Sequence, residues 1–201
     1  MNSMNETQWD KKLKIHTIGR DESRADRFRY PYEPTPYCVL ERLAQSGYIS
    51  RSSCLVDYGC GKGRVGIFLT AQTGCKAIGV ECDERIYRQA QNNLQSCTVG
   101  KNIQLLCTDA AQFIPEKADC FYFFNPFSVE ILAPVLQNIK QTWYEAPRKM
   151  YLFFYYPNDD YRALLEEDDF LSCVEEIDCR DLFDGTDRRE TILVYELKDQ
   201  I

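Results

Sequence analysis

Short apolar runs alternate with helix-like segments along most of the chain. Five of these runs have the length and composition of buried strands. They are CLVD at 54–57, AIGVE at 77–81, IQLLC at 103–107, CFYFF at 120–124 and MYLFFYY at 150–156. After Asp83, a favourable N-cap, Ile86, Ala90 and Leu94 recur at helical spacing. The alternation predicts an α/β fold with a doubly wound, mostly parallel sheet that is covered on both faces.

The remaining segments complete this pattern. Helices are expected at 35–46, 64–71 and 161–167, and from Ser128 through Ile139. Pro134 is expected to kink the helix that starts near Ser128, or to delay its start, because proline has no backbone N–H. Two final strands, at 171–177 and 191–197, are joined by the polar loop FDGTDRRE with no clear helix between them. This order allows an antiparallel hairpin at the edge of the sheet.

The amino-terminal part of the chain is more polar than the rest. Residues 1–34 are expected to form a solvated segment, partly mobile or lid-like, because their lysines and arginines are interleaved with acids. Residues 35–201 are expected to form a single domain, since no repeat, low-complexity tract or linker divides them. An aromatic cluster near this boundary is expected to fold over a ligand site or to dock beside the sheet. Its members are Phe28, Tyr30, Tyr32 and Tyr37.

Composition and charge exclude several classes of function. A formal charge of −7 and a pI near 4.9 argue against a protein that finds nucleic acid by attraction to phosphate. The 10 cysteines include no C-x-x-C, so free thiols in a reducing cytoplasm are expected. No signal peptide or long apolar span indicates a membrane. The sole histidine, His16, lies in the polar segment, which disfavours a His-based zinc site and a Ser-His-Asp hydrolase; no metal site is expected.

The stretch DYGCGKGRVG at 57–66 lies between a strand and a helix, where doubly wound sheets bind their ligands. Read from Gly61, it is the G-x-G-x-x-G of a dinucleotide-binding turn. That interpretation places Asp57 beside a pyrophosphate of like charge. The amino-acid moiety of S-adenosylmethionine resolves the conflict, because its ammonium suits an acid and its carboxylate suits the helix amides. Lys62 and Arg64 flank the loop and are expected to be solvated.

Two more acids stand at the ends of the next two strands. Glu81 can accept hydrogen bonds from ribose hydroxyls, although either cofactor would use it in this way. Asp109, in the stretch Thr108-Asp109-Ala110, can accept from the exocyclic amine of adenine, and an aspartate there is also a common N-cap. Three acids on successive strand ends fit an adenosyl ligand without phosphates.

The series DYGCGKG, GVE, TDA and FFNPF resembles the motifs of class I S-adenosylmethionine-dependent methyltransferases, over roughly residues 35–156. The resemblance implies a Rossmann-like sheet of seven strands with the last strand antiparallel, and S-adenosyl-L-methionine as the cofactor. The cofactor contacts that it implies are Asp57, Gly59, Cys60, Gly61 and Gly63 at the methionine end, Glu81 at the ribose, and Asp109 with Ala110 at the adenine. A weaker likeness, carried by RYPYEPTPYCVLERL, links the chain to small lysine methyltransferases and to bacterial methyltransferase-like proteins.

The segment Asn125-Pro126-Phe127-Ser128 resembles the N-P-P-aromatic motif of amino methyltransferases that act on DNA, RNA or glutamine. Asn125 is therefore the candidate catalytic residue, as an acceptor for a target amine, and a further cofactor contact. Ser128 replaces the stacking aromatic, a loss of roughly 1 to 3 kcal/mol of recognition for a flipped base. The alternative is a segment that only turns the chain, with Ser128 as the cap of the next helix.

These observations predict a methyltransferase that acts on a nitrogen or oxygen of a small molecule or a protein side chain. Substrate contacts are expected from Tyr32, Thr35, Tyr37 and Phe127, with core packing as the competing role for the tyrosines. Two alternatives stay open. One is a non-catalytic module that keeps the cofactor fold, and the other is a nucleic-acid methyltransferase, which the acidic charge and the missing stacking ring disfavour. The oligomeric state is not predicted.

Overall fold

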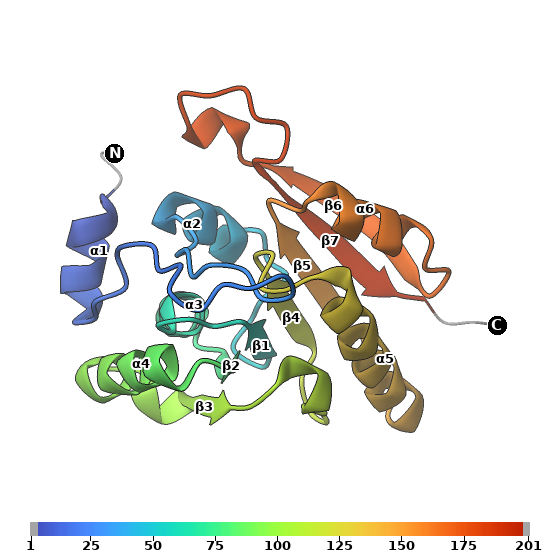
Figure 1. Ribbon diagram of the computed structural model, residues 1–201, viewed down its shortest axis with the longest axis horizontal. Helices are drawn as coiled ribbons and strands as arrows, with labels where there is room; N and C mark the ends of the chain where they lie inside the picture. Colours follow the sequence, from blue (N-terminus) through green and yellow to red (C-terminus); the bar gives the residue numbers. More distant parts are fainter. Residues whose placement is uncertain (1–3, 199–201) are drawn as a thin grey trace.

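A computed structural model describes residues 4–198 and contains a seven-stranded sheet at its centre (Figure 1). The strand order is β3-β2-β1-β4-β5-β7-β6. The strands are β1 (Cys54–Tyr58), β2 (Lys76–Glu81), β3 (Ile103–Cys107), β4 (Cys120–Phe123), β5 (Tyr151–Tyr155), β6 (Leu171–Asp178) and β7 (Thr191–Leu197). All seven predicted strands are confirmed.

The pairing of the strands confirms the doubly wound, mostly parallel fold. Strands β1 to β5 pair in parallel, and β7 pairs antiparallel with both β5 and β6. The chain builds β1, β2 and β3 outward in one direction and then returns to place β4 on the other side of β1. This reversal of strand order leaves a crevice between the carboxyl ends of β1 and β4, where such sheets bind ligands.

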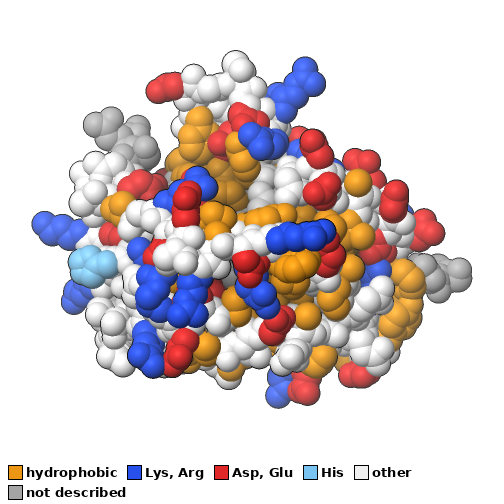
Figure 2. Space-filling model, in the orientation of Figure 1, with side chains coloured by type: hydrophobic (Ala, Val, Ile, Leu, Met, Phe, Trp, Pro, Cys, Tyr) orange, Lys and Arg blue, Asp and Glu red, His pale blue; other side chains and the backbone are white. Residues whose placement is uncertain are grey.

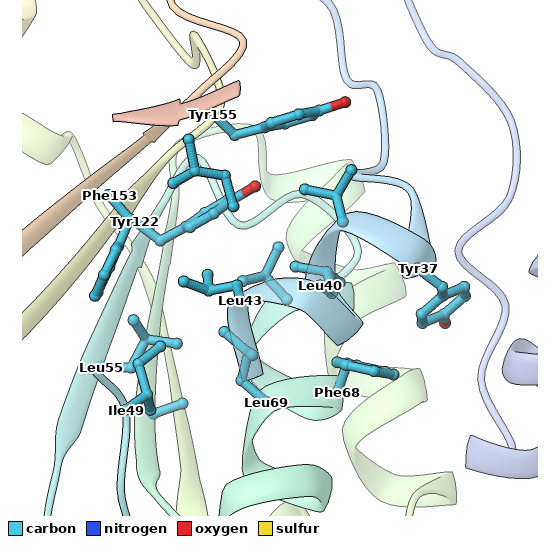
Figure 3. Close-up of a cluster of buried hydrophobic side chains, with 14 of the residues drawn as sticks. Tyr37, Leu40, Leu43, Ile49, Leu55, Phe68, Leu69, Tyr122, Phe153 and Tyr155 are labelled. Carbon is cyan, nitrogen blue, oxygen red and sulfur yellow. The ribbon is translucent and has the colours of Figure 1, made fainter. Parts of the chain in front are cut away.

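Helices cover both faces of the sheet, with α1 to α4 on one side and α5 on the other (Figure 1). The helices are α1 (Glu6–Leu13), α2 (Tyr37–Gln45), α3 (Arg64–Thr73), α4 (Glu84–Ser96), α5 (Val129–Glu145) and α6 (Asp159–Glu166). Figure 3 shows side chains from α2, α3 and the central strands meeting in one of the two cores. The second core lies between the sheet and α5 with α6. The two faces are apolar because successive strand residues point to opposite sides.

The delayed start expected from Pro134 is wrong. Helix α5 begins at Val129, directly after Ser128, and Pro134 lies inside it. The helix continues through the proline because Leu132, Val135 and neighbouring apolar residues are buried against the sheet. Tertiary packing therefore offsets the one backbone hydrogen bond that Pro134 cannot donate.

The amino-terminal segment contains a helix that the sequence patterns did not predict. Asn5 and Gln8 form a capping box at the start of α1. Trp9, 4% exposed, packs with its ring edge against Phe68 of α3 at a centroid distance of 4.9 Å. Ile15 is also buried. The expectation of a solvated segment is therefore wrong for this part of it, because one face of α1 completes the core over α2 and α3.

Among the residues that the structure describes, no helix is both long and apolar enough to span a membrane.

Candidate cofactor and acceptor site

A cavity of about 360 Å³ lies at the carboxyl ends of β1 to β4, in the crevice where the strand order reverses. One wall comes from the residues that end β1, β2 and β3. The opposite wall comes from residues 21–35, here called the roof segment, and from Phe124, Pro126 and Phe127 after β4. The cavity therefore joins elements that are far apart in the sequence.

The loop after β1 turns sharply beneath the cavity. Gly59 and Gly61 have φ angles of +70° and +54°, a region that residues with a Cβ rarely adopt. A Cβ on Gly59 would lie 2.3 Å from the Cβ of Pro126, and a Cβ on Gly61 would lie 2.3 Å from the ring of Tyr32. The glycines thus allow both the turn and the close approach of the segments that cover it.

Asp57, near the end of β1, is a buried ionisable residue. It is 3% exposed, and its Oδ2 atom has no hydrogen-bond partner in the described part of the chain. Burial, with a smaller contribution from the charge of Glu81, raises the pKa of Asp57 to about 8. A buried carboxyl group that lacks a partner and lines a cavity is suited to a cationic ligand.

Glu81, at the end of β2, shapes the glycine loop as well as the cavity wall. Its Oε2 atom accepts from the backbone N–H of Gly61 at 3.0 Å, and its Oε1 atom accepts from that of Asp83 at 2.8 Å. Burial raises the pKa of Glu81. Each carboxylate oxygen keeps a second lone pair, so Glu81 can still accept hydrogen bonds from a ligand.

Asp109 follows β3 and serves as the N-cap of a short 3₁₀ turn, with its Oδ1 atom accepting from Ala111 N–H at 2.9 Å. Its Oδ2 atom accepts from Nη2 of Arg29 in the roof segment at 2.8 Å. The role of N-cap that the sequence left open is therefore confirmed. Asp109 and Ala110 also line the cavity.

The roof segment is fastened at several points along its length. The backbone N–H of Tyr30 donates to Pro126 O at 3.2 Å, and that of Ser128 donates to Phe28 O at 2.9 Å. At the other side of the cavity, Arg85 of α4 pairs with Asp21 at 2.7 Å. These contacts place residues 21–35 across the mouth of the cavity, as a lid would lie.

The structure brings together most of the residues predicted for the site. The cavity lining includes Asp57, Gly59, Cys60, Glu81, Asp109, Ala110, Tyr32, Thr35 and Phe127. Gly61, Gly63, Asn125 and Tyr37 do not belong to the lining among the described residues. The first two belong to the loop after β1. Gly61 lies close to the ring of Tyr32, and Gly63 is the N-cap of α3.

Asn125 is held by the loop that follows β5. Its φ angle is +40°, its Nδ2 donates to Tyr156 O at 2.7 Å, and its Oδ1 accepts from Asn158 N–H at 3.3 Å. The side chain thus ties the carboxyl ends of β4 and β5 together. Its catalytic and cofactor-binding roles remain predictions.

Tyr37 lies in the core, which was the competing role expected for it. Its side chain is fully buried, and its hydroxyl donates to Asp10 of α1 at 2.6 Å (Figure 3). The ring packs against Trp9 and Phe68. Tyr37 therefore connects α1 to α2 and α3.

Several residues of the cavity were missed by the sequence analysis. Tyr122 of β4 is the cross-strand partner of Asp57, and its hydroxyl lies 2.9 Å from Oγ1 of Thr35. Arg64 was expected to be solvated, which is wrong, because it is 2% exposed and lines the cavity. The alternation of β4 places Tyr122 on the face of Asp57, but only the pairing of β1 with β4 brings the two residues together.

Comparisons with known proteins agree with this geometry. Residues 55–146 match the family model described as a methyltransferase domain. A protein-lysine N-methyltransferase of Saccharolobus islandicus (strain REY15A) is 35% identical over 66 residues, which are 32% of this chain and 41% of that protein. The matched stretch thus spans less than half of the curated relative.

Solved structures show the same fold. An RNA methyltransferase from Salinibacter ruber, in complex with S-adenosyl-L-homocysteine, has a TM-score of 0.57 at 18% identity, covering 84% of this chain and 96% of its own. A TehB-like SAM-dependent methyltransferase from Corynebacterium glutamicum has a TM-score of 0.58 at 18% identity, covering 80% and 88%.

The family match over residues 55–146 and the shared fold agree with a methyltransferase domain in this part of the chain. The described residues of the cavity fit S-adenosylmethionine. The unpartnered carboxyl group of Asp57 suits the ammonium of the amino-acid moiety, and Glu81 and Asp109 line the same wall in the order of the strands.

Proposed function

We propose that this protein transfers a methyl group from S-adenosylmethionine to a nitrogen or oxygen atom of a small molecule or of a protein side chain. The observation that carries the proposal is Asp57, a buried residue that lines the cavity at the strand-order reversal and whose Oδ2 atom has no hydrogen-bond partner in the part of the chain that the structure describes. A dinucleotide would place a phosphate there, whereas the amino-acid moiety of S-adenosylmethionine offers an ammonium.

The cofactor, when bound, supplies an electrophilic methyl group on a sulfonium. The protein contributes binding and alignment, because positioning supplies much of the rate of such a transfer. Asp57 orients the amino-acid moiety, Glu81 accepts from the ribose hydroxyls, and Asp109 with Ala110 contacts the adenine. The roof segment covers these groups and excludes water from them.

The acceptor enters on the side of the roof segment and of β4. Tyr32, Thr35 and Phe127 line this side together with Phe124 and Pro126. The side chains are mainly aromatic or apolar and suit an uncharged reacting atom, such as a neutral amine or a hydroxyl. A nitrogen acceptor on a protein is consistent with the protein-lysine N-methyltransferase that the chain resembles over part of its length.

A nucleic-acid acceptor is the less favoured function. Two of the three arginines of the roof segment lie near acids, since Arg29 contacts Asp109 at 2.8 Å and Arg24 lies 3.9 Å from Asp83. Figure 2 shows basic and acidic side chains interspersed over the face that it presents. The alternative is kept because the Salinibacter RNA methyltransferase shares the fold. Salt-sensitive binding of RNA would favour this alternative.

Isothermal titration calorimetry with S-adenosylmethionine, S-adenosylhomocysteine and NAD tests the proposed cofactor. We expect both sulfur ligands to bind and NAD to bind more weakly or not at all. Asp57→Ala and Glu81→Ala should each weaken binding, while Glu84→Ala, at an exposed position of α4, should not. Tighter binding of NAD, or unchanged affinity in both site variants, would contradict the proposal.

Turnover distinguishes the enzyme from a binding module. Methyl transfer to a panel of amines, phenols and lysine-containing peptides should be measured with labelled cofactor. Transfer to one class of acceptor supports the enzyme, whereas cofactor binding without any transfer supports the non-catalytic alternative.

A further inference from the structure

Arg64, the first residue of α3, is a buried cation in the wall of the cavity. It follows Gly63 directly, is 2% exposed, and lines the same cavity as Asp57. A charged side chain is rarely buried to this degree unless it is paired or hydrogen-bonded. Its partners therefore decide what it can still bind.

Two nitrogen atoms of the guanidinium group bind the amino-terminal part of the chain. Nε donates to Oγ1 of Thr17 at 2.7 Å, and Nη1 donates to Thr35 O at 3.0 Å and also pairs with Glu6 of α1. Nη2 is different. It has no hydrogen-bond partner within residues 4–198, and it lies 3.8 Å from Oδ1 of Asp10.

Asp10 is already engaged by other donors. It accepts from the backbone N–H of Thr17 at 2.6 Å, from the Thr17 hydroxyl at 2.7 Å and from the Tyr37 hydroxyl at 2.6 Å. These three bonds fix the carboxylate on the side of α1. Within the described residues, the Nη2 atom of Arg64 therefore keeps an unused donor, on a side chain that lines the cavity.

The start of α3 adds a second feature that favours an anion. Gly63 is the N-cap and provides no side-chain hydrogen bond, so the described residues leave the first amides of α3 uncapped. The positive end of the helix dipole lies at these amides. Arg64 and Val65 both line the cavity, which places this helix end at its wall.

We propose that Arg64 binds the carboxylate of the amino-acid moiety of S-adenosylmethionine, opposite the ammonium at Asp57, and that α1 positions Arg64 through Glu6 and Asp10. Among the described residues, the cavity wall then carries an unused donor on Arg64 and an unused carboxyl oxygen on Asp57 for the two ends of a zwitterion. The inference rests on the proposed function. It also makes the amino-terminal helix part of the cofactor site, although α1 itself does not line the cavity within the described residues.

Three ligands that differ only at the amino-acid end test this assignment. S-adenosylhomocysteine carries the carboxylate and the ammonium, its decarboxylated analogue carries only the ammonium, and 5′-methylthioadenosine carries neither. Affinities should be measured by calorimetry for the wild type, Arg64→Gln, Arg64→Lys and Asp57→Asn. Arg88→Gln, at an exposed position of α4, is the matched control for the loss of an arginine.

We expect Arg64→Gln to lower the affinity for S-adenosylhomocysteine by roughly 10- to 100-fold, the usual range for a lost hydrogen bond to a charged group. Its affinities for the decarboxylated analogue and for methylthioadenosine should stay within about twofold, since neither ligand has the carboxylate. Asp57→Asn should lower the affinities for S-adenosylhomocysteine and its decarboxylated analogue, which carry the ammonium. It should leave the affinity for methylthioadenosine unchanged. Arg64→Lys should recover part of the loss, and Glu6→Gln should reproduce a smaller part of it.

A purely structural role for Arg64 would lower all three affinities by the same factor, and this result would overturn the inference. Equal affinities of the wild type for the homocysteine ligand and its decarboxylated analogue would overturn it as well, even if the Arg64 variants do not fold. If the wild type binds methylthioadenosine but neither of the other ligands, the proposed cofactor itself fails.

Discussion

The two walls of the cavity are built in different ways. The wall that carries Asp57, Glu81 and Asp109 consists of the ends of three adjacent parallel strands, with the hydrogen bonds of the sheet directly beneath. The wall opposite is the roof segment, which crosses the cavity from Asp21 to Thr35 with little regular structure of its own. The first wall presents polar groups on fixed strand ends, and the second covers them; in the proposed function the first wall binds the cofactor and the second admits the acceptor.

The interactions that hold the two walls in place also differ in strength. The roof segment depends on a few backbone hydrogen bonds to residues 126–128 and on ion pairs such as Arg29 with Asp109, whose side chains are 38% and 32% exposed. Ion pairs of this exposure contribute about 0 to 1 kcal/mol each. Local opening of the roof segment should therefore require less free energy than any change in the strands. Three variants test this difference.

Gly61→Ala should have the largest effect, because Gly61 lies where the two walls touch. The new Cβ would lie 2.3 Å from the ring of Tyr32, at a φ angle of +54°. We expect the free energy of unfolding to fall by roughly 3 kcal/mol, from strain and overpacking together. Chemical denaturation measures this loss.

Gly47→Ala is the matched control, since Gly47 has a φ angle of +86° and a Cβ added there would have no atom of the described chain within 4 Å. This control should lose only about 1 kcal/mol. Removing the ring in a Tyr32→Ala background should bring the two losses closer together. If Gly61→Ala and Gly47→Ala lowered the free energy of unfolding equally with Tyr32 present, Tyr32 would not pack closely against the loop.

Asp57→Asn should have the next largest effect, on the wall of strand ends. We expect the affinity for S-adenosylhomocysteine to fall by roughly 10- to 100-fold at about pH 8.5, because the ammonium loses a charged partner. The effect should vary with pH. With the pKa of Asp57 raised to about 8, the empty protein keeps this proton up to that pH, and an ammonium ligand must expel it.

The wild-type affinity should therefore rise by about tenfold per pH unit at most below about pH 8 and level off above it, whereas Asp57→Asn should show a flatter profile. The same shift lowers the stability of the empty protein as the pH rises from about 4 to about 8, because the unfolded chain releases this proton first. Asp57→Asn should remove that loss. Parallel pH profiles for the two proteins would contradict this account of Asp57.

Arg29→Gln should have the smallest effect, on the fastening of the roof segment. The ion pair with Asp109 is partly exposed, so the affinity for S-adenosylhomocysteine should change by no more than about fivefold. The dissociation rate should increase more than the affinity falls, since opening of the roof segment precedes release. Stopped-flow measurements with Arg88→Gln as the control would detect this change, because Arg88 is an exposed arginine of α4 whose ion pair with Glu84 lies outside the roof segment. If Arg29→Gln lowered the affinity as much as Asp57→Asn does, the proposed difference between the two walls would be wrong.

The sequence predicted the wall of strand ends well, because the sequence signals for these residues are local. Asp57 and Glu81 each end an apolar run, and Asp83 stands where a helix must begin. Each signal lies within a few residues of the group it places. The parallel order of the strands then brings these ends to one edge of the sheet.

The residues that the sequence misplaced depend on contacts between distant segments. Arg64 follows a glycine loop and has the pattern of a solvated charge, but α1 packs over it and supplies Glu6. Tyr37 has the pattern of a ligand-facing aromatic, but Asp10 accepts its hydroxyl in the core. Both outcomes depend on the docking of α1, whose short polar sequence gives a weak helical signal by itself.

The sequence by itself determined the doubly wound sheet and the acids at the strand ends, because apolar periodicity and the glycine loop act over a few residues. Only the tertiary structure decided that Oδ2 of Asp57 has no partner within residues 4–198, that Arg64 is buried in the same cavity wall, and that residues 21–35 lie across the cavity. These properties depend on which groups lose contact with water when remote segments pack, and burial of that kind is a property of the assembled chain.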